Sequence, residues 1–134
     1  MARLRTEVMI MNRSKLIRGY IDNEGYARAE ALNENDVRAD SLAYLLKAGM
    51  QGNAKSAEKA LDRLAAFERG ERADVVIGGN DIVIKVSRDE AVFVNRHLSS
   101  DEQPNCHYTI DELRDALEDW RDMILAFLQK SSPN

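Results

Sequence analysis

The spacing of apolar residues in the second half of the chain constrains the fold most. Between residues 73 and 95, Val and Ile either alternate with polar residues or run continuously, which is typical of half-buried and buried strands. The Gly-Gly-Asn-Asp turn at 78–81 tolerates the positive φ of a tight hairpin. The pattern predicts three strands: residues 74–77, 82–86 and 91–95.

After a polar, acidic loop at 99–108, the spacing becomes that of an amphipathic helix. Thr109 and Glu112 have the spacing of a capping box, in which the hydroxyl and the carboxylate each accept a hydrogen bond from a backbone N–H that the helix leaves unpaired. The helix should bury one face. That face carries Leu113, Ala116, Leu117, Trp120, Ile124, Phe127 and Leu128.

The first half begins with strand signals. Residues 6–12 and 15–21 are rich in β-branched and aromatic side chains and predict a hairpin. The Asp-Asn-Glu-Gly sequence at 22–25 predicts a turn. Residues 26–32 fit either a third strand or a helix, because Ala and Glu favour helix. The turn before them favours the strand.

Two helices are expected next. Asn35 or Asp36 can cap a helix that runs to about Ala48. The Gln-Gly-Asn sequence at 51–53 interrupts it, and a second helix is expected over 54–68. The short connection predicts a helical hairpin.

Together these elements predict a single α+β domain over residues 1–134, with a mainly antiparallel sheet, a helical hairpin and a C-terminal amphipathic helix packed on the sheet. The expected core is Val8, Ile10, Ile17, Leu42, Leu45, Leu61, Leu64, Ile82, Ile84, Phe93, Leu113, Leu117, Trp120 and Ile124.

The length of the apolar runs and the single cysteine indicate the cellular compartment of the protein. The run after the N-terminal arginines, Val8 to Met11, is only four residues long, whereas a secretory signal needs about 7–15 apolar residues and a membrane helix about 20. Cys106 is the single cysteine, so no internal disulfide can form. We expect a cytoplasmic protein that does not enter a membrane.

Charge is distributed unevenly along the chain. The net charge is −4, yet residues 1–20 hold five basic groups and one acidic group, and residues 99–134 hold eight acidic groups and three basic ones. An acidic surface attracts a basic partner and repels nucleic acid. A merely solvated helix face is the alternative. The predicted partner-binding residues are Asp101, Glu102, Asp111, Asp115, Glu118 and Asp122, of which the last four share one side of the C-terminal helix.

Catalytic signatures are lacking. The sequence contains no nucleophile elbow, P-loop or dinucleotide fingerprint. His97, Cys106 and His107 are the only imidazole or thiol groups, and they lack the paired spacing of a structural zinc site. We therefore expect no catalytic residue, no metal and no cofactor. A small metal-dependent enzyme that uses these three residues is one alternative.

RNA binding is the other alternative. The N-terminal region combines basic groups with aromatic rings, as single-stranded RNA binding requires. The pI of about 5.2 argues against it, because nucleic-acid-binding domains usually have a pI above about 9. The residues concerned are Arg3, Arg5, Arg13, Lys15 and Arg18, with Tyr20 and Tyr26 nearby.

The C-terminal half resembles small bacterial immunity proteins of contact-dependent growth inhibition. The resemblance rests on residues 81–86 and 90–95, the acidic loop after them, residues 108–113 and Trp120, and covers less than half of the chain. It implies a non-enzymatic, acidic inhibitor that occludes a basic, nuclease-type toxin. The charge distribution favours the same class of function, so we expect an immunity or antitoxin protein.

Overall fold

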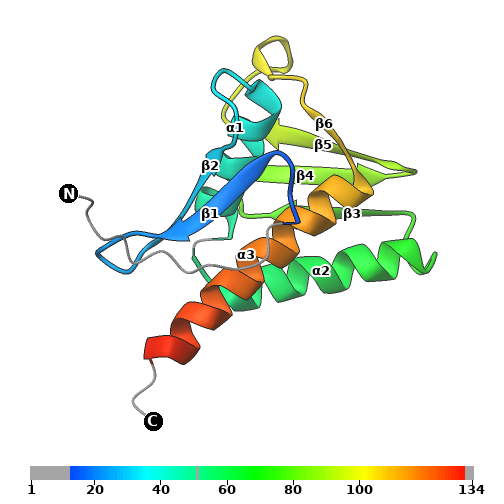
Figure 1. Cartoon of the computed structure of the whole chain (residues 1–134). Helices are drawn as coiled ribbons and strands as arrows, with labels where there is room; N and C mark the ends of the chain where they lie inside the picture. Colours follow the sequence, from blue (N-terminus) through cyan, green and yellow to red (C-terminus); the bar gives the residue numbers. More distant parts are fainter. Residues whose placement is uncertain (1–12, 51, 132–134) are drawn as a thin grey trace.

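The computed structural model describes residues 13–50 and 52–131, which form helices and antiparallel sheets in the α+β arrangement expected from the sequence (Figure 1). A two-stranded sheet pairs β1 with β2, and a four-stranded sheet has the order β3-β4-β5-β6. In chain order the elements are β1 (Ile17–Ile21), β2 (Ala27–Ala31), α1 (Val37–Tyr44), the π-helical turn η1 (Leu45–Gly49), α2 (Ala54–Glu68), β3 (Asp74–Gly78), β4 (Ile82–Ser87), β5 (Glu90–Asn95), the 3₁₀ turn η2 (Ser100–Glu102), β6 (His107–Thr109) and α3 (Ile110–Ser131).

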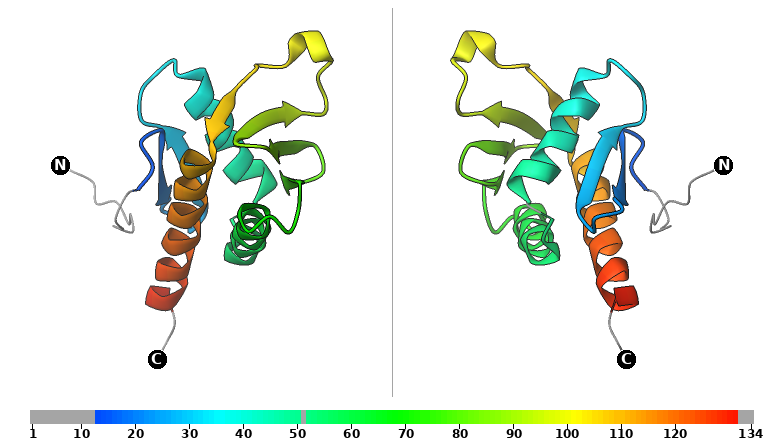
Figure 2. Two further views of the ribbon diagram at one scale, coloured as in Figure 1. Left: turned by 90° about the vertical axis from the view of Figure 1, so that its right-hand side faces the viewer. Right: turned by 90° about the vertical axis from the view of Figure 1, so that its left-hand side faces the viewer.

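The four-stranded sheet confirms the three predicted strands. Its pairing is antiparallel throughout, and Ile84 lies between Ile77 and Phe93 in neighbouring strands. All three are buried. Helices α1, α2 and α3 lie to one side of this sheet (Figure 2). The apolar side of the strands therefore forms the core together with the helices.

The hairpin of β1 and β2 settles the ambiguous segment at 26–32, which forms a strand. The Asp22 carboxylate accepts hydrogen bonds from the N–H groups of Glu24 and Tyr26, and Gly25 adopts a φ of 88°. This turn pairs residues 17–21 with 27–31 and overrides the helix preference of Ala and Glu. The predicted pairing of residues 6–12 with 15–21 lies outside the described residues.

The first predicted helix consists of two parts. Asp36 caps α1 by accepting a hydrogen bond from the Ala39 N–H at 3.1 Å. The chain then widens into η1, in which the consecutive residues Leu45 and Leu46 are both buried. Gly49 at its end lies against the β3–β4 turn, where a Cβ would be 3.2 Å from the Gly79 nitrogen. This close backbone approach joins η1 to the sheet.

The second predicted helix forms as expected, with Asn53 as its N-cap. It follows η1 after a short connection, but α2 packs mainly along α3 and next against β3. Gly70, with a φ of 79°, ends it.

The loop predicted at 99–108 contains two elements that the sequence did not indicate. Ser99 and Glu102 form a capping box around η2. β6 then adds three residues to the sheet and pairs Tyr108 with Ala91. Tyr108 is buried, and its hydroxyl donates to the Arg38 carbonyl oxygen at 2.6 Å. A strand of three residues is too short for a periodicity to be recognised.

Helix α3 begins at the predicted capping box. The Thr109 hydroxyl accepts from the Glu112 N–H, and the Glu112 carboxylate accepts from the Thr109 N–H, both at 3.0 Å.

Every described residue of the predicted core is buried except Leu61, which is partly buried. Val8 and Ile10 lie outside the described residues. Leu128 was expected on the buried face but is 55% exposed, because α3 extends past the rest of the fold (Figure 2).

Replacing Gly78 by Ala should destabilise the protein by about 3 kcal/mol or more, through backbone strain and a steric clash. Gly78 has a φ of 131°, and a Cβ would lie 2.5 Å from the Ile82 carbonyl oxygen. Gly70→Ala is the matched control, because its φ is also positive but nothing lies within 4 Å of the added Cβ. It should cost about 1 kcal/mol. Urea unfolding measures both changes, and equal losses would contradict the close approach at Gly78.

Candidate functional site

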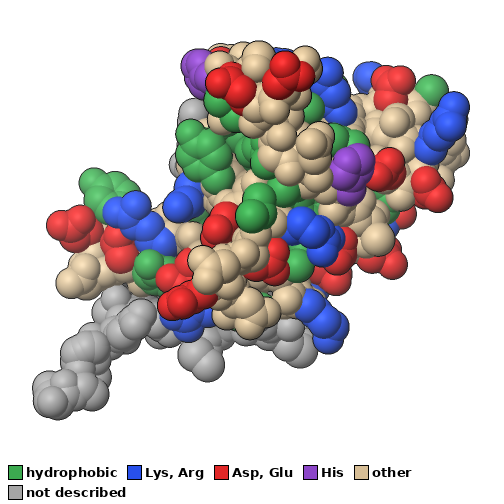
Figure 3. All heavy atoms as spheres, turned by 90° about the horizontal axis from the view of Figure 1, so that it is seen from above, with side chains coloured by type: hydrophobic (Ala, Val, Ile, Leu, Met, Phe, Trp, Pro, Cys, Tyr) green, Lys and Arg blue, Asp and Glu red, His purple; other side chains and the backbone are tan. Residues whose placement is uncertain are grey.

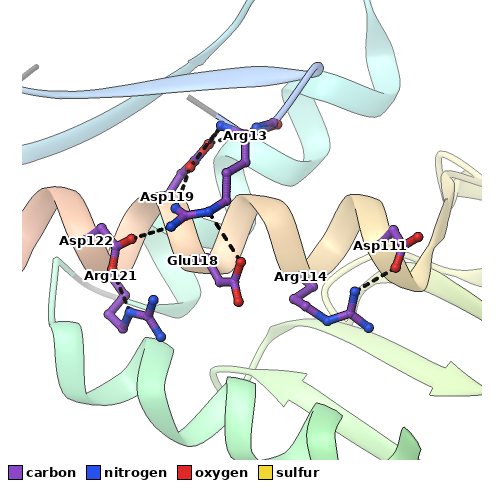
Figure 4. Close-up of polar contacts among 8 residues, drawn as sticks. Arg13, Asp111, Arg114, Glu118, Asp119, Arg121 and Asp122 are labelled. Atoms are coloured by element: carbon purple, nitrogen blue, oxygen red, sulfur yellow. Dashed lines mark hydrogen bonds and ion pairs between the residues drawn. The ribbon is translucent and has the colours of Figure 1, made fainter. Parts of the chain in front are cut away.

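The acidic stripe of α3 consists of Asp111, Asp115, Glu118 and Asp122. The segment that leads into β1 lies beside the later part of this stripe. Asp119 is only 8% exposed and binds this segment to the helix. Its carboxylate accepts hydrogen bonds from the Arg13 and Ser14 N–H groups, each at 2.9 Å, and from the Arg13 guanidinium at 3.1 Å (Figure 4). The Ser14 hydroxyl in turn accepts from the Ile17 N–H. Asp119 is thus a structural anchor rather than part of a free surface.

The Arg13 guanidinium also spans two of the predicted binding residues. Its Nη2 lies 2.9 Å from Asp122 Oδ2, and its Nε lies 3.5 Å from Glu118 Oε1. Arg121 contacts Asp122 as well, at 2.8 Å. Burial opposes ionisation of Asp122, but the hydrogen bonds from Arg121 and Arg13 outweigh it, so the pKa of this carboxyl is lowered.

Asp111 lies at the beginning of α3 and is paired too. Arg114 Nη1 is 2.6 Å from its Oδ1, and the same guanidinium reaches Glu68 at the end of α2. The Asp111 side chain is 83% exposed, however, so this pair is weakly held. Arg114 thereby joins α2 to α3. Figure 4 shows its contact with Asp111 on α3.

The remaining predicted residues differ in their roles. Glu102 belongs to the capping box of η2, where the Ser99 N–H donates to its carboxylate and lowers its pKa. Within the described part of the chain, Asp101 and Asp115 make no ion pair. The six residues therefore do not form one uniform group of solvated charges.

Ion pairs within the molecule change the picture of four acidic residues that share one side of α3. Arginines of the same molecule pair with Asp111, Glu118 and Asp122, and the repulsion is offset by pairing. Figure 3 likewise shows acidic and basic side chains interspersed on the face seen from above. The binding role of the six residues stays a prediction, but the surface is less anionic than a count of its carboxylates indicates. The sequence could not reveal Arg13 as the partner of Glu118 and Asp122, because it lies more than 100 positions away from both.

Two basic residues of the N-terminal region, Arg13 and Arg18, are paired in the same way, whereas Arg3 and Arg5 lie outside the described residues. Besides Arg13, Arg18 contacts Glu30 and Arg28 contacts Asp22, at 2.7 and 2.8 Å. These pairs lower the positive potential that an RNA backbone would meet. They weaken the RNA-binding alternative.

The three candidate metal ligands are held by separate contacts. His97 lies 3.1 Å from Asp81, and His107 contacts Glu90. Cys106 is buried, with its Sγ 3.5 Å from the Ser41 hydroxyl. Among residues 13–50 and 52–131, no group of three or more His, Cys, Asp or Glu side chains could hold a metal ion.

An open hollow of about 510 Å³ lies beside His107. Arg38 and Glu112 pair on its wall, and the Arg38 guanidinium stands over the Tyr108 ring at 5.2 Å. Two residues of this wall carry hydroxyls: Thr109 serves as the cap of α3, and the Tyr108 hydroxyl donates to the Arg38 carbonyl oxygen. The polar groups here are engaged with one another, and the arrangement does not resemble a nucleophile with its base.

Comparison with models of protein families, with curated proteins and with solved structures finds no match. In the described residues, none of the helices combines the length and the apolar character needed to span a bilayer.

Asp119→Ala should destabilise the protein by about 3 kcal/mol, because it leaves the Arg13 and Ser14 N–H groups without their acceptor. Asp115→Asn, on the same helix but without an ion pair among the described residues, should change the free energy of unfolding by less than about 0.5 kcal/mol. Chemical denaturation of both variants measures the difference. Similar losses in the two would mean that Asp119 does not anchor the segment.

The Asp122 pairing should make stability depend on pH. Its pKa is lower in the folded protein than in the unfolded chain, so the contribution is present above the unfolded value, about 3.9, and is lost as the pH falls through the folded value. Asp122→Asn should therefore lower the free energy of unfolding at pH 6 but not near pH 2. Urea unfolding across this range measures it. A loss that does not vary with pH would refute the ionic origin.

Proposed function

We propose that this chain is a non-enzymatic binding protein that occludes a basic protein partner, as the immunity proteins that it resembles do with a nuclease-type toxin. The partner's surface would meet the outward side of α3. The proposed site of action is the cytoplasm, which suits a chain whose single cysteine, Cys106, is buried and free.

The observation that carries this proposal is the excess of acid that remains on α3 after internal pairing. Helix α3 carries six carboxylates over residues 111–122, and five of them pair with four arginines. Asp115 lies near the middle of the stripe and makes no ion pair with a described residue. The four arginines are Arg13, Arg38, Arg114 and Arg121.

The pairing also supports the choice of a protein partner. Arginine contacts hold Glu118 and Asp122 in fixed positions, so little side-chain entropy is lost when a partner arrives. A lysine or arginine of the partner can then approach Asp115, which lies about one helical turn before Glu118. Such a surface mainly accelerates association with a positively charged protein, and salt weakens the effect.

The structure determines which carboxylates can be changed without harming the fold. Glu118 and Asp122 hold Arg13, so replacing them would lower the stability of the fold as well. An effect on binding could then not be separated from an effect on stability. Asp101, Asp111 and Asp115 have no such role. The triple variant Asp101→Asn/Asp111→Asn/Asp115→Asn should therefore slow association with the basic partner, identified by pull-down from the native host, by about tenfold at low salt.

The matched control removes three carboxylates elsewhere: Glu24→Gln/Glu34→Gln/Asp62→Asn. These side chains are exposed on the β1–β2 turn, the loop before α1 and α2. The control removes the same number of negative charges, so it should slow association by less than about twofold if position matters. Stopped-flow kinetics at two salt concentrations compares the variants. The proposal fails if the two triple variants behave alike, or if no basic protein from the native host binds.

A further inference from the structure

The last turns of α3 expose two large apolar side chains. Leu125 is 41% exposed and Leu128 is 55% exposed, and their spacing of three residues places them side by side. Other apolar residues of α3, such as Met123 and Ile124, are buried. The exposure follows from the position of this end, which extends past the sheets (Figures 1 and 2).

An open groove of about 590 Å³ adjoins these leucines. It lies between the end of α3, the first turn of α2 and the β1–β2 hairpin. Ile21 and Ala27 line it from the hairpin, and Ala54 lines it from α2. On its α2 side lie one cation and one anion, Lys55 and Glu58, both exposed and without an ion pair among the described residues.

We propose that a second copy of this chain packs on the groove, related to the first by a two-fold axis. A two-fold interface must be self-complementary, since residue i of one copy contacts residue j of the other and the reverse. The charges of the groove meet this requirement, because its lining holds one cation, Lys55, and one anion, Glu58. Leu125 and Leu128 can pack against the same leucines of the second copy, while Lys55 of each copy faces Glu58 of the other.

The size of the groove sets the expected affinity. It is lined by one helix end and two short neighbouring segments, so we expect a dimer to bury less than the roughly 1,200 Å² that is typical of a stable complex. The dimer should therefore be weak and form at micromolar concentrations of the full chain. This inference uses the C-terminal end of α3 and does not depend on the proposed binding of a basic partner by residues 111–122.

Analytical ultracentrifugation of the full chain between about 5 and 500 μM tests the proposal. The unchanged chain should shift from monomer to dimer across this range, and Leu125→Asp should remain monomeric. Leu32→Asp is the matched control, because Leu32 is equally exposed, at 42%, and lies at the end of β2 away from the groove lining. It should dimerise like the unchanged chain.

Charge reversal tests the two-fold pairing itself. Lys55→Glu and Glu58→Lys should each raise the dimer dissociation constant about five- to tenfold, because each brings like charges together across the axis. The double variant exchanges the two charges and should return the constant to within about twofold.

Three results would overturn the proposal: a monomer at every concentration, a dimer that Leu125→Asp leaves intact, or a double variant as weak as the single ones. If the chain stays monomeric and Leu125→Asp also lowers its melting temperature, the leucine is covered from within its own chain.

Discussion

The fold depends on the packing of α3 against both sheets. This helix contacts β1 on one side and β5 and β6 on the other, and α2 lies along it. Its inward face is buried around Trp120, and the Asp119 carboxylate binds the backbone that leads into β1. The Trp120 Nε1–H has no hydrogen-bond partner among the described residues, so the ring stabilises this junction through apolar contact and not through a polar one.

Elements with a local signal could be predicted from the sequence. The period of two in β3–β5, the period of 3.6 in α3 and the capping box at Thr109 need only neighbouring residues to be recognised, and the structure has all of them. What was missed depends on distant contacts. β6 is a strand because β5 and α1 hold it, and η1 is widened where Gly49 meets the β3–β4 turn.

The candidate site was only partly predictable for the same reason. Helical spacing correctly places Asp111, Asp115, Glu118 and Asp122 on one side of α3. It cannot show that an arginine near the start of the chain lies across Glu118 and Asp122. Pairing changes the meaning of such a stripe: some carboxylates stabilise the fold, and Asp115 is the member without an ion pair among the described residues. A count of charges overstates the field that a partner experiences.

The central claim is that the outward side of α3 contacts a positively charged protein. The most direct measurement is a backbone amide chemical-shift titration of the labelled chain with the basic protein captured by pull-down from the native host. The account predicts that the largest shifts fall at residues 111–122 and diminish as salt is added. Shifts centred on the side of β3–β5 turned away from the helices, with residues 111–122 unchanged, would contradict it.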